Sequence, residues 1–360
     1  MKRCTRCILP ETFPGIRFDE EGVCQYCQRM PATGPQAERR ATQKDRLRAR
    51  FEELVRQVRA RPGYHCLMSW SGGKDSTYTL WLLREQYDLR TLAFTFDNGF
   101  VSPAALNNMR AVAESLGVDH VIVKPRFDLL RQIFVASTQP GMYPPRALER
   151  ASGICNSCMA LAKGIGLRMA LEKDIPMLAY GWSPGQIPLA SALLRTNPRM
   201  LRAMLEAALA PLEKVAAGQV SAYFPEEHHL ENVRHPDARH PDVREFPYNV
   251  SPLAFLEYDE ETALRRIQPL GWERPQDTDP NSTNCLLNSF ANMIHVEQMG
   301  YHPYVMELAG LVREGYMSRE EALGRLEVAA APAVVAAVAA KLGISPSRGR
   351  DTVDQVADKG

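Results

Sequence analysis

The sequence has no long hydrophobic run and almost no net charge. None of its apolar stretches reaches the roughly 20 residues that a membrane-spanning helix needs, and Met1 is followed directly by Lys2-Arg3-Cys4, without a signal-peptide core. We therefore expect a cytoplasmic protein with no membrane contact. The formal net charge of +1 over 360 residues means that overall electrostatics does not demand nucleic acid. The composition, 45% hydrophobic and 24% charged, is typical of a globular protein of about two domains.

Cysteine is also scarce, but most of it is grouped. Eight cysteines in a cytoplasmic chain favour metal or redox chemistry over disulfides. Four of them form two CxxC knuckles, Cys4/Cys7 and Cys24/Cys27. Such a pair of knuckles is typical of a zinc ribbon, in which bound Zn²⁺ would supply the folding free energy that so short a segment lacks. The pattern also allows two disulfides or four free thiols.

The second group is Cys155-x-x-Cys158 with the distant Cys285. Three thiolates are one short of a closed structural zinc site, but they suit a [4Fe–4S] cluster with one iron left open for a non-protein ligand. A redox CxxC beside an unrelated Cys285, or a partial zinc site, would fit the same spacing. Cys66 stands in an apolar run, where we expect it to pack as a small hydrophobic residue.

The most informative stretch is Ser71-Gly72-Gly73-Lys74-Asp75-Ser76, which lies between an apolar run and a helical pattern. Two glycines allow a tight bend and a close approach of the backbone to a ligand. A helix that begins there directs unpaired N–H groups and its positive dipole end at that ligand. Lys74 adds a charge and the serines add hydroxyls, so the stretch predicts a phosphate-binding loop. The alternative is an ordinary glycine turn. The GxxxxGK[ST] spacing of kinases and GTPases is absent.

Strand-like and helix-like runs alternate around this loop. We expect strands at 65–70, 92–96, 120–123 and 177–180, and helices at 76–86, 103–116 and 158–171. This alternation predicts an α/β fold, a doubly wound parallel sheet. Ligands bind at the carboxyl ends of such strands, where Asp97 and Gly181 stand. Asp97 is expected to hold magnesium or contact the nucleotide, although Asp97-Asn98-Gly99 is also an ordinary turn sequence.

The chain divides into five segments. These are a zinc ribbon at 1–33, a basic linker helix at 34–62, a nucleotide-binding domain at 63–300 with an insertion at about 190–250, a C-terminal helical region at 301–345 and a flexible tail at 346–360. The positive surplus of the linker helix suits an RNA backbone, although such a run is more often a solvated helix face. The insertion should contain a helix at 193–215 and then a mobile polar loop or lid, since its histidines match no zinc motif: His228, His229, His235 and His240.

The six residues 71–76 resemble the SGGKDS signature of the PP-loop family, the ATP pyrophosphatases. That resemblance implies that a substrate oxygen attacks the α-phosphate of ATP, that pyrophosphate leaves, and that a nitrogen or sulfur nucleophile then displaces AMP. It also implies a set of ATP-binding residues: Ser69, Ser71, Gly72, Gly73, Lys74, Asp75, Ser76, Asp97 and Gly181. Among these, Lys74, Asp75 and Asp97 are candidate catalytic residues, with Lys163 as a further catalytic cation and Mg²⁺ as the counterion of the phosphates.

Two branches of this family resemble different parts of the chain. The opening, residues 4–12 and 18–24, and the tail stretch 313–323 are similar to bacterial N-acetyl sugar amidotransferases, which take ammonia from a partner glutaminase. The order of Cys155/Cys158, Pro252-Leu253 and Cys285 resembles the iron–sulfur tRNA thiolation enzymes. That resemblance implies a [4Fe–4S] cluster on the three cysteines. The acid pair that usually follows the fourth-strand glycine in those enzymes is missing after Gly181.

We therefore expect an adenylating transferase that inserts sulfur, with an N-acetyl sugar amidotransferase as the alternative. A third hypothesis is a nucleic-acid-binding zinc module with a regulatory ATP loop. The expected cofactors are ATP, Mg²⁺, Zn²⁺ and a [4Fe–4S] cluster. The expected partners are an acceptor (tRNA, a nucleotide-linked sugar or another small molecule), a sulfur donor or glutaminase, and a second copy of the chain.

Overall fold

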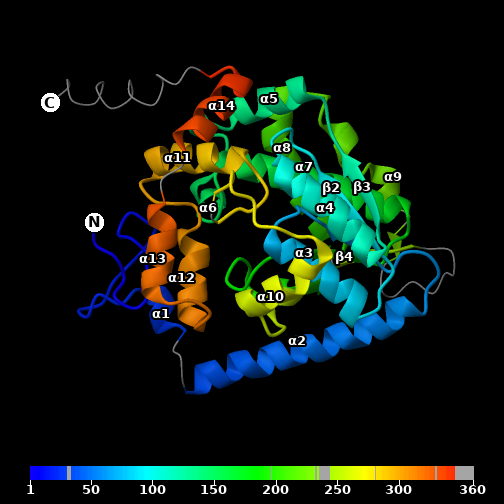
Figure 1. The fold of residues 1–360 in the computed structure, drawn as a ribbon, viewed down its shortest axis with the longest axis horizontal. Helices are drawn as coiled ribbons and strands as arrows, with labels where there is room; N and C mark the ends of the chain where they lie inside the picture. Colours follow the sequence, from blue (N-terminus) through cyan, green and yellow to red (C-terminus); the bar gives the residue numbers. More distant parts are fainter. Residues whose placement is uncertain are drawn as a thin grey trace.

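A computed structural model describes residues 1–30, 34–195, 197–231, 233–234, 244–279, 281–328 and 331–344. His235, His240 and the segment 346–360 lie outside the described residues. The centre of the molecule is a six-stranded sheet in the order β3-β2-β1-β4-β8-β5, and all its pairings are parallel except that between β5 and β8 (Figure 1). Its strands are β1 (Cys66–Ser69), β2 (Thr91–Phe96), β3 (Asp119–Val123), β4 (Met177–Tyr180), β5 (Leu193–Arg195) and β8 (Tyr248–Val250).

Helices cover both faces of this sheet, as Figure 1 shows. In chain order they are α1 (Gln25–Gln28), α2 (Pro35–Arg59), α3 (Lys74–Trp81), α4 (Pro103–Leu116), α5 (Phe127–Ala136), α6 (Pro145–Leu148), α7 (Gly153–Glu172), α8 (Pro198–Ala216), α9 (Glu227–Glu231), α10 (Glu260–Ile267), α11 (Leu287–Met299), α12 (Val305–Glu314), α13 (Arg319–Glu327) and α14 (Pro332–Leu342). A two-stranded sheet joins β6 (Val233–Arg234) to β7 (Arg244–Glu245), and a π-helical turn, Leu82–Gln86, extends α3.

The two faces follow from the alternation of side chains along each strand. Cys66 and Met68 of β1 belong to a core with residues of α2, α3, α4 and α10. Leu67, between them, belongs to a second core with residues of α7, α8 and α9. The fold is therefore α/β, a doubly wound and mostly parallel sheet, as the sequence predicted. Cys66 is fully buried, as expected for a small hydrophobic residue.

The order of the strands places a switch point between β1 and β4. The chain runs from β1 to β2 and β3 on one side and then returns to β4 on the other side of β1. Crossovers on opposite faces leave a crevice between the carboxyl ends of the two strands at such a point, and ligands of doubly wound sheets bind there. Ser71–Ser76 follows β1 and Gly181 follows β4, so both flank this crevice.

Two predicted helices begin several residues away from their expected starts. The helix expected at 158–171 is α7, which begins at Gly153 after the cap Ser152. The sequence predicted a helix over 193–215, but Leu193–Arg195 forms β5, which pairs antiparallel with β8, and the helix begins at Pro198. Leucine has a high helix propensity, but here the edge of the sheet offers unpaired backbone groups that a short strand satisfies. Asn197 then caps α8 by accepting a hydrogen bond from the N–H of Met200.

The N-terminal residues pack against the C-terminal helices. Cys4, Ile8 and Phe13 share one core with Tyr301 and Leu308 of the 301–326 region, and Figure 1 shows the N-terminal chain beside α12 and α13. Among the described residues, no single helix is long and apolar enough to cross a bilayer. By length and composition, α13 and α14 pass such a test only as a pair that is bent by 54°.

Candidate active site

The predicted phosphate-binding loop, Ser71–Ser76, has the geometry that its glycines predict. Gly72 has a φ of +77°, which glycine adopts without strain, and α3 begins directly afterwards at Lys74. At the end of β4, a Cβ atom on Gly181 would lie 2.4 Å from Cα and 2.6 Å from the backbone N of Ser76. Only glycine allows the end of β4 and the first turn of α3 to come this close, so these two backbone segments lie in direct contact.

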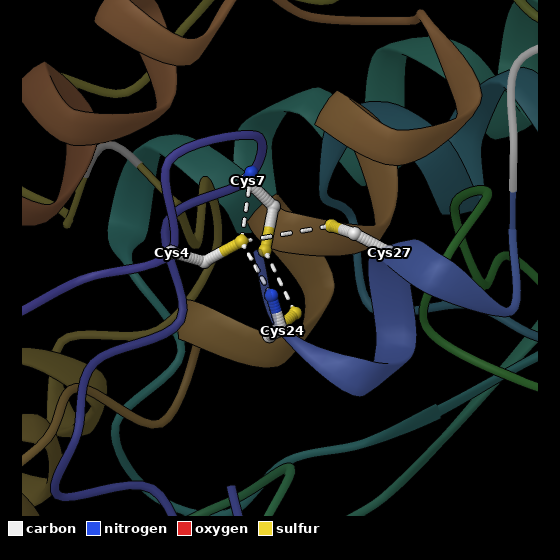
Figure 2. A group of neighbouring side chains, drawn as sticks. All are labelled: Cys4, Cys7, Cys24 and Cys27. Carbon is white, nitrogen blue, oxygen red and sulfur yellow. Dashed lines mark hydrogen bonds between the residues drawn. The ribbon is translucent and has the colours of Figure 1, made fainter. Parts of the chain in front are cut away.

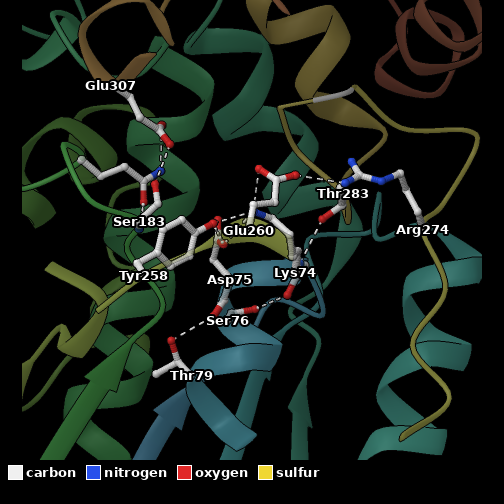
Figure 3. Close-up of polar contacts among 12 residues, drawn as sticks. Lys74, Asp75, Ser76, Thr79, Ser183, Tyr258, Glu260, Arg274, Thr283 and Glu307 are labelled. Carbon is white, nitrogen blue, oxygen red and sulfur yellow. Dashed lines mark hydrogen bonds and ion pairs between the residues drawn. The ribbon is translucent and has the colours of Figure 1, made fainter. Parts of the chain in front are cut away.

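The amine of Lys74 is held by neighbouring polar groups (Figure 3). It lies 3.0 Å from Oδ1 of Asp75 and 3.2 Å from Oε2 of Glu260, and it donates a hydrogen bond of 2.6 Å to the hydroxyl of Tyr258. That hydroxyl in turn donates to Asp75 at 2.6 Å. Burial raises the pKa of Tyr258, and the nearby Asp75 carboxylate raises it further, so the phenol stays a donor. Lys74 is thus oriented before any ligand arrives.

A single cavity of about 540 Å³ is lined both by residues of the predicted phosphate loop and by the three grouped cysteines. Its lining includes Ser69, Ser71, Ser76 and Gly181 as well as Cys155, Cys158 and Cys285. The sequence predicted these two groups separately, and the structure brings them to one cavity. Lys74, Asp75 and Asp97 do not line this cavity; Lys163 does.

Cys285 reaches the cavity because its segment pairs with the loop after β2. The N–H of Leu286 donates to the carbonyl of Phe100 at 2.9 Å, and the N–H of Ser102 donates to the carbonyl of Asn284 at 2.9 Å. On the other side of this segment, Thr283 accepts a hydrogen bond of 3.1 Å from the N–H of Lys74. Residues 283–286 therefore contact the start of α3, more than 200 residues earlier in the sequence, and also place Cys285 at the cavity.

Amide side chains donate hydrogen bonds to all three sulfurs. Nδ2 of Asn98 lies 3.5 Å from Sγ of Cys158 and 3.5 Å from Sγ of Cys285, and Nδ2 of Asn288 lies 3.8 Å from Sγ of Cys155. Both asparagines are buried. Burial raises the pKa of the Cys155 thiol to about 11 and also raises that of Cys158 and Cys285. The thiols are therefore neutral unless a metal replaces their protons.

The spacing of these sulfurs differs from that of a single-ion site. Among the described residues, the N-terminal cysteines are the only group of three or more ligands within 4.8 Å of one another. A mononuclear site with 2.3 Å bonds needs sulfurs about 3.8 Å apart. In a polynuclear cluster each cysteine binds a different iron, so its sulfurs stand farther apart. The donor set and the N–H···S contacts suit such a cluster.

The cavity carries more positive than negative charge. Its described lining has three cationic side chains, Arg146, Arg150 and Lys163, and one carboxylate, Glu307. Surrounding protein atoms lower the pKa of the Lys163 amine by burial, and this amine lies 5.4 Å from the centre of the Trp182 ring. Arg150 donates to the carbonyls of Gly185 and Gln186. This balance suits an anionic ligand such as a polyphosphate.

Glu307 is a site residue that the sequence analysis missed. It extends from α12 and accepts hydrogen bonds of 2.7 Å from the hydroxyl of Ser183 and 2.8 Å from Nε2 of Gln186. Burial raises its pKa to about 7, although these two donors oppose the shift. Nothing near residue 307 in the sequence indicates such a role. The available signal was the stretch 182–186 after Gly181, which contains no acidic residue. In the structure, Glu307 of α12 supplies the carboxylate that contacts this stretch.

Asp97 lies apart from the cavity. Its Oδ2 pairs with the amine of Lys124 at 3.0 Å and its Oδ1 accepts a hydrogen bond of 2.8 Å from the N–H of Gly99. The carboxylate therefore closes the turn after β2. The residue of this turn that lines the cavity is Asn98, which the sequence analysis did not select.

The four N-terminal cysteines converge on one point (Figure 2). Their sulfurs all lie within 4.8 Å of one another, with 3.8 Å between those of Cys4 and Cys27 and 3.7 Å between those of Cys7 and Cys24. These separations are close to the edge of a tetrahedron with 2.3 Å bonds, about 3.8 Å. Arg313 of α12 donates to Sγ of Cys7 at 3.7 Å. The cysteines could hold a metal ion, and a disulfide is not formed between any of them.

Two proteins similar to this chain each share only a low sequence identity with it. No family model matches the chain. A relative described as an uncharacterized protein of Methanocaldococcus jannaschii is 22% identical over 327 residues, which cover 90% of this chain and 93% of the relative. Among solved structures, the U34-tRNA thiolase NcsA from Methanococcus maripaludis with its [4Fe–4S] cluster matches at 18% identity, a TM-score of 0.33 and coverage of 88% of this chain and 87% of the thiolase. The function must therefore be inferred from the chemistry of the site.

Proposed function

We propose that this chain is an ATP-dependent adenylating transferase of the PP-loop type that replaces an oxygen of its acceptor with sulfur. The observation that carries this proposal is the shared cavity, whose lining includes both residues of the predicted phosphate loop and the three cysteines. ATP hydrolysis alone would not require three cysteines in the cavity that binds the nucleotide. Electron transfer by the three cysteines alone would not require a phosphate-binding loop in the same cavity.

The loop residues would bind the phosphates of ATP. The first turn of α3 supplies unpaired N–H groups and the positive end of the helix dipole, and the hydroxyls of Ser71 and Ser76 line the cavity beside it. Lys163, Arg146 and Arg150 would neutralise charge that develops on the α-phosphate and the leaving pyrophosphate. Asp75 would be the candidate ligand of a phosphate-bound Mg²⁺ and would exchange its contacts with Lys74 and Tyr258 for the ion. Asp97 is paired with Lys124.

Cys155, Cys158 and Cys285 would hold a [4Fe–4S] cluster, which supplies a site at which sulfide is bound and delivered to the activated carbon. Asn98 and Asn288 would orient the three ligands and stabilise their negative charge through N–H···S hydrogen bonds. The N-terminus of α7, whose cap Ser152 accepts from the N–H of Cys155, adds a favourable dipole. Cys4, Cys7, Cys24 and Cys27 would hold a structural Zn²⁺.

The acceptor class that we propose to test first is tRNA. Helix α2 exposes Arg39, Arg46 and Arg50 along its length, and such guanidinium groups can follow a phosphate backbone. The division into an N-terminal metal module, the linker helix, the catalytic domain and a helical C-terminal region stays part of this proposal. So does the location of the protein in the cytoplasm.

Anaerobic purification followed by a product assay tests the function. We expect a brown protein with about four iron atoms per chain, as one cubane cluster requires, that converts ATP to AMP and pyrophosphate when unfractionated tRNA and sulfide are present. Cys155→Ser should lose the colour and the sulfur transfer. The matched control is Cys66→Ala, since Cys66 is buried in β1 away from the cavity. Production of ADP and orthophosphate alone would contradict the proposal, and a colourless protein that consumes ammonia would favour amide formation.

A further inference from the structure

Glu307 is the only carboxylate among the described residues that line the cavity. It reaches the cavity from α12, close to the strand end at Gly181. Its two hydrogen-bond donors, Ser183 and Gln186, belong to the loop that directly follows this glycine. Because Gly181 packs against the backbone of Ser76, the same loop connects Glu307 to the start of α3 (Figure 3). The carboxylate thus lines the same cavity as Ser71, Ser76 and the three cysteines.

The close packing under Glu307 fixes its position. A Cβ atom on Gly310, one turn further along α12, would lie 3.0 Å from Cα of Gly185. The backbone of α12 therefore rests directly on the loop 183–186. One turn before Glu307, Tyr304 accepts a hydrogen bond of 3.2 Å from Nδ2 of Asn288, which also contacts Cys155. The carboxylate is therefore held in place by two hydrogen-bond donors and lines the cavity, where it can contact a bound ligand.

We propose that Glu307 is the base of the adenylation step. This inference rests on the proposed function. An acceptor carbonyl next to an N–H group attacks the α-phosphorus of ATP, so that an O–P bond forms and the bond between the α-phosphorus and the pyrophosphate oxygen breaks. O-adenylation would leave a positive charge on the acceptor's C–N–H group, and this charge is removed only when the N–H proton leaves. The carboxylate of Glu307 takes that proton, and pyrophosphate carries away the electron pair of the broken bond.

Burial is the main cause of the raised pKa of Glu307, and neighbouring charged groups adjust it further. Asp75 opposes its ionisation and Lys74 favours it, both from α3. Tyr258, Tyr304 and Arg150 also lie within electrostatic reach. With a pKa of about 7, the side chain is ionised and able to accept a proton above neutral pH, and is protonated and unable to do so below it. Adenylation should therefore slow as the pH falls below about 7.

The test compares Glu307→Gln with Glu314→Gln at several pH values. Glu314 is on the same helix but pairs with Lys44, away from the cavity, so it controls for a general effect of changing α12. With unfractionated tRNA as the acceptor, Glu307→Gln should release AMP and pyrophosphate about 10²–10⁴-fold more slowly and lose the acid limb of its pH profile. Its affinity for α,β-methylene-ATP should equal that of the wild type. Glu307→Asp should restore part of the rate.

A second pair of variants tests the position of the group. Ser183→Ala and Gln186→Ala each remove a donor that stabilises the carboxylate, so the pKa of Glu307 should rise and the acid limb should move to higher pH by about one unit. An infrared titration of the carboxyl band, wild type minus Glu307→Gln, should show a midpoint near 7 without any substrate.

Several results would overturn the inference. These are a Glu307→Gln variant with wild-type rate and pH profile, a loss confined to nucleotide affinity, or a carboxyl band that titrates at its ordinary pH. A wild-type protein that never forms AMP would refute the proposed function itself. The infrared midpoint, which needs no turnover, separates these two failures.

Discussion

At Gly181 the absence of a side chain decides whether the strand end and the phosphate loop can touch. A methyl group there would lie 2.4 Å from Cα of Ser76, inside any normal contact distance, and the obstructing atom is backbone. We expect Gly181→Ala to destabilise the protein by about 1–3 kcal/mol and to weaken ATP binding about tenfold or more, which corresponds to at least 1.4 kcal/mol.

Thermal unfolding and a nucleotide titration measure the two effects of Gly181→Ala. Gly324→Ala is the matched control, because Gly324 lies within α13 and a methyl group added there would meet nothing within 4 Å. That change should leave ATP binding intact and, by helix propensity, slightly raise the stability. A Gly181→Ala protein that binds ATP as tightly as the wild type would contradict the close approach.

Site residues that could be predicted from the sequence lie in locally determined structure, whereas those that could not be predicted depend on contacts between distant segments. Ser71–Ser76 could be found because its strand, glycines and helix are neighbours in the chain, and local geometry follows from local sequence. Asn98, Asn288 and Glu307 carry no such local signal. Each of them acquires its place from contacts between segments that are far apart in sequence, and ordinary polar residues at those positions look like surface.

At the scale of elements, prediction succeeded where caps and periodicity agree. The expected helix at 103–116 is α4, whose start is set by Ser102 and Pro103 and whose end is set by Gly117 in the left-handed region. The strand at 177–180 is β4. The edge strand β5 and its neighbour β8 were not predicted because each has only three residues, too few to show an alternating pattern. Their pairing within the sheet makes them strands.

The N-terminal cysteine group and α12 form one packed unit. Arg313 of α12 contacts Cys7 and Tyr26, and Arg319 donates to the carbonyls of Cys4 and Cys7. If a metal holds these cysteines, its removal should loosen the helix that carries Glu307. We expect Cys4→Ser, or treatment with a strong chelator, to remove about one zinc per chain and to speed hydrogen exchange of the amides of α12.

Cys285→Ser is the control for the metal experiment, since Cys285 belongs to the other cysteine group. It should keep its zinc and the slow exchange of α12. Full zinc content in the Cys4→Ser protein would refute a site made by the four N-terminal cysteines. Unchanged exchange in a zinc-free protein would refute the coupling to α12.

Across the whole molecule, Glu260 connects parts that are distant in sequence. Its carboxylate lies 3.2 Å from the amine of Lys74, 3.2 Å from Arg274 and 3.0 Å from Arg325 of α13. Burial alone would raise its pKa, but Lys74 and Arg325 outweigh burial and lower the pKa to about 2. Because the folded-state pKa is below the ordinary value of about 4.3, the resulting stability is present above pH 4–5 and is lost as the pH falls toward 2.

Glu260→Gln should therefore lower the stability by about 1–3 kcal/mol near pH 7, and the difference from the wild type should shrink as the pH is lowered from 5 to about 2. Denaturant unfolding at each pH measures it. Glu261→Gln is a suitable control, since its pairing with Arg265 is largely exposed and worth at most a few tenths of a kcal/mol. A difference that is independent of pH would show that the network does not depend on the charge of Glu260.

The packing of the N-terminal residues against the 301–326 region also has a consequence for biosynthesis. Thr12 donates a hydrogen bond to the carbonyl of Gly300, 288 positions later. At ribosomal rates of 5–20 residues per second, roughly 15–60 s pass before that partner leaves the exit tunnel. During this interval the two CxxC knuckles lack the C-terminal helices against which they pack in the folded protein. Early binding of a metal ion would protect their four thiols from oxidation until those helices have been synthesised.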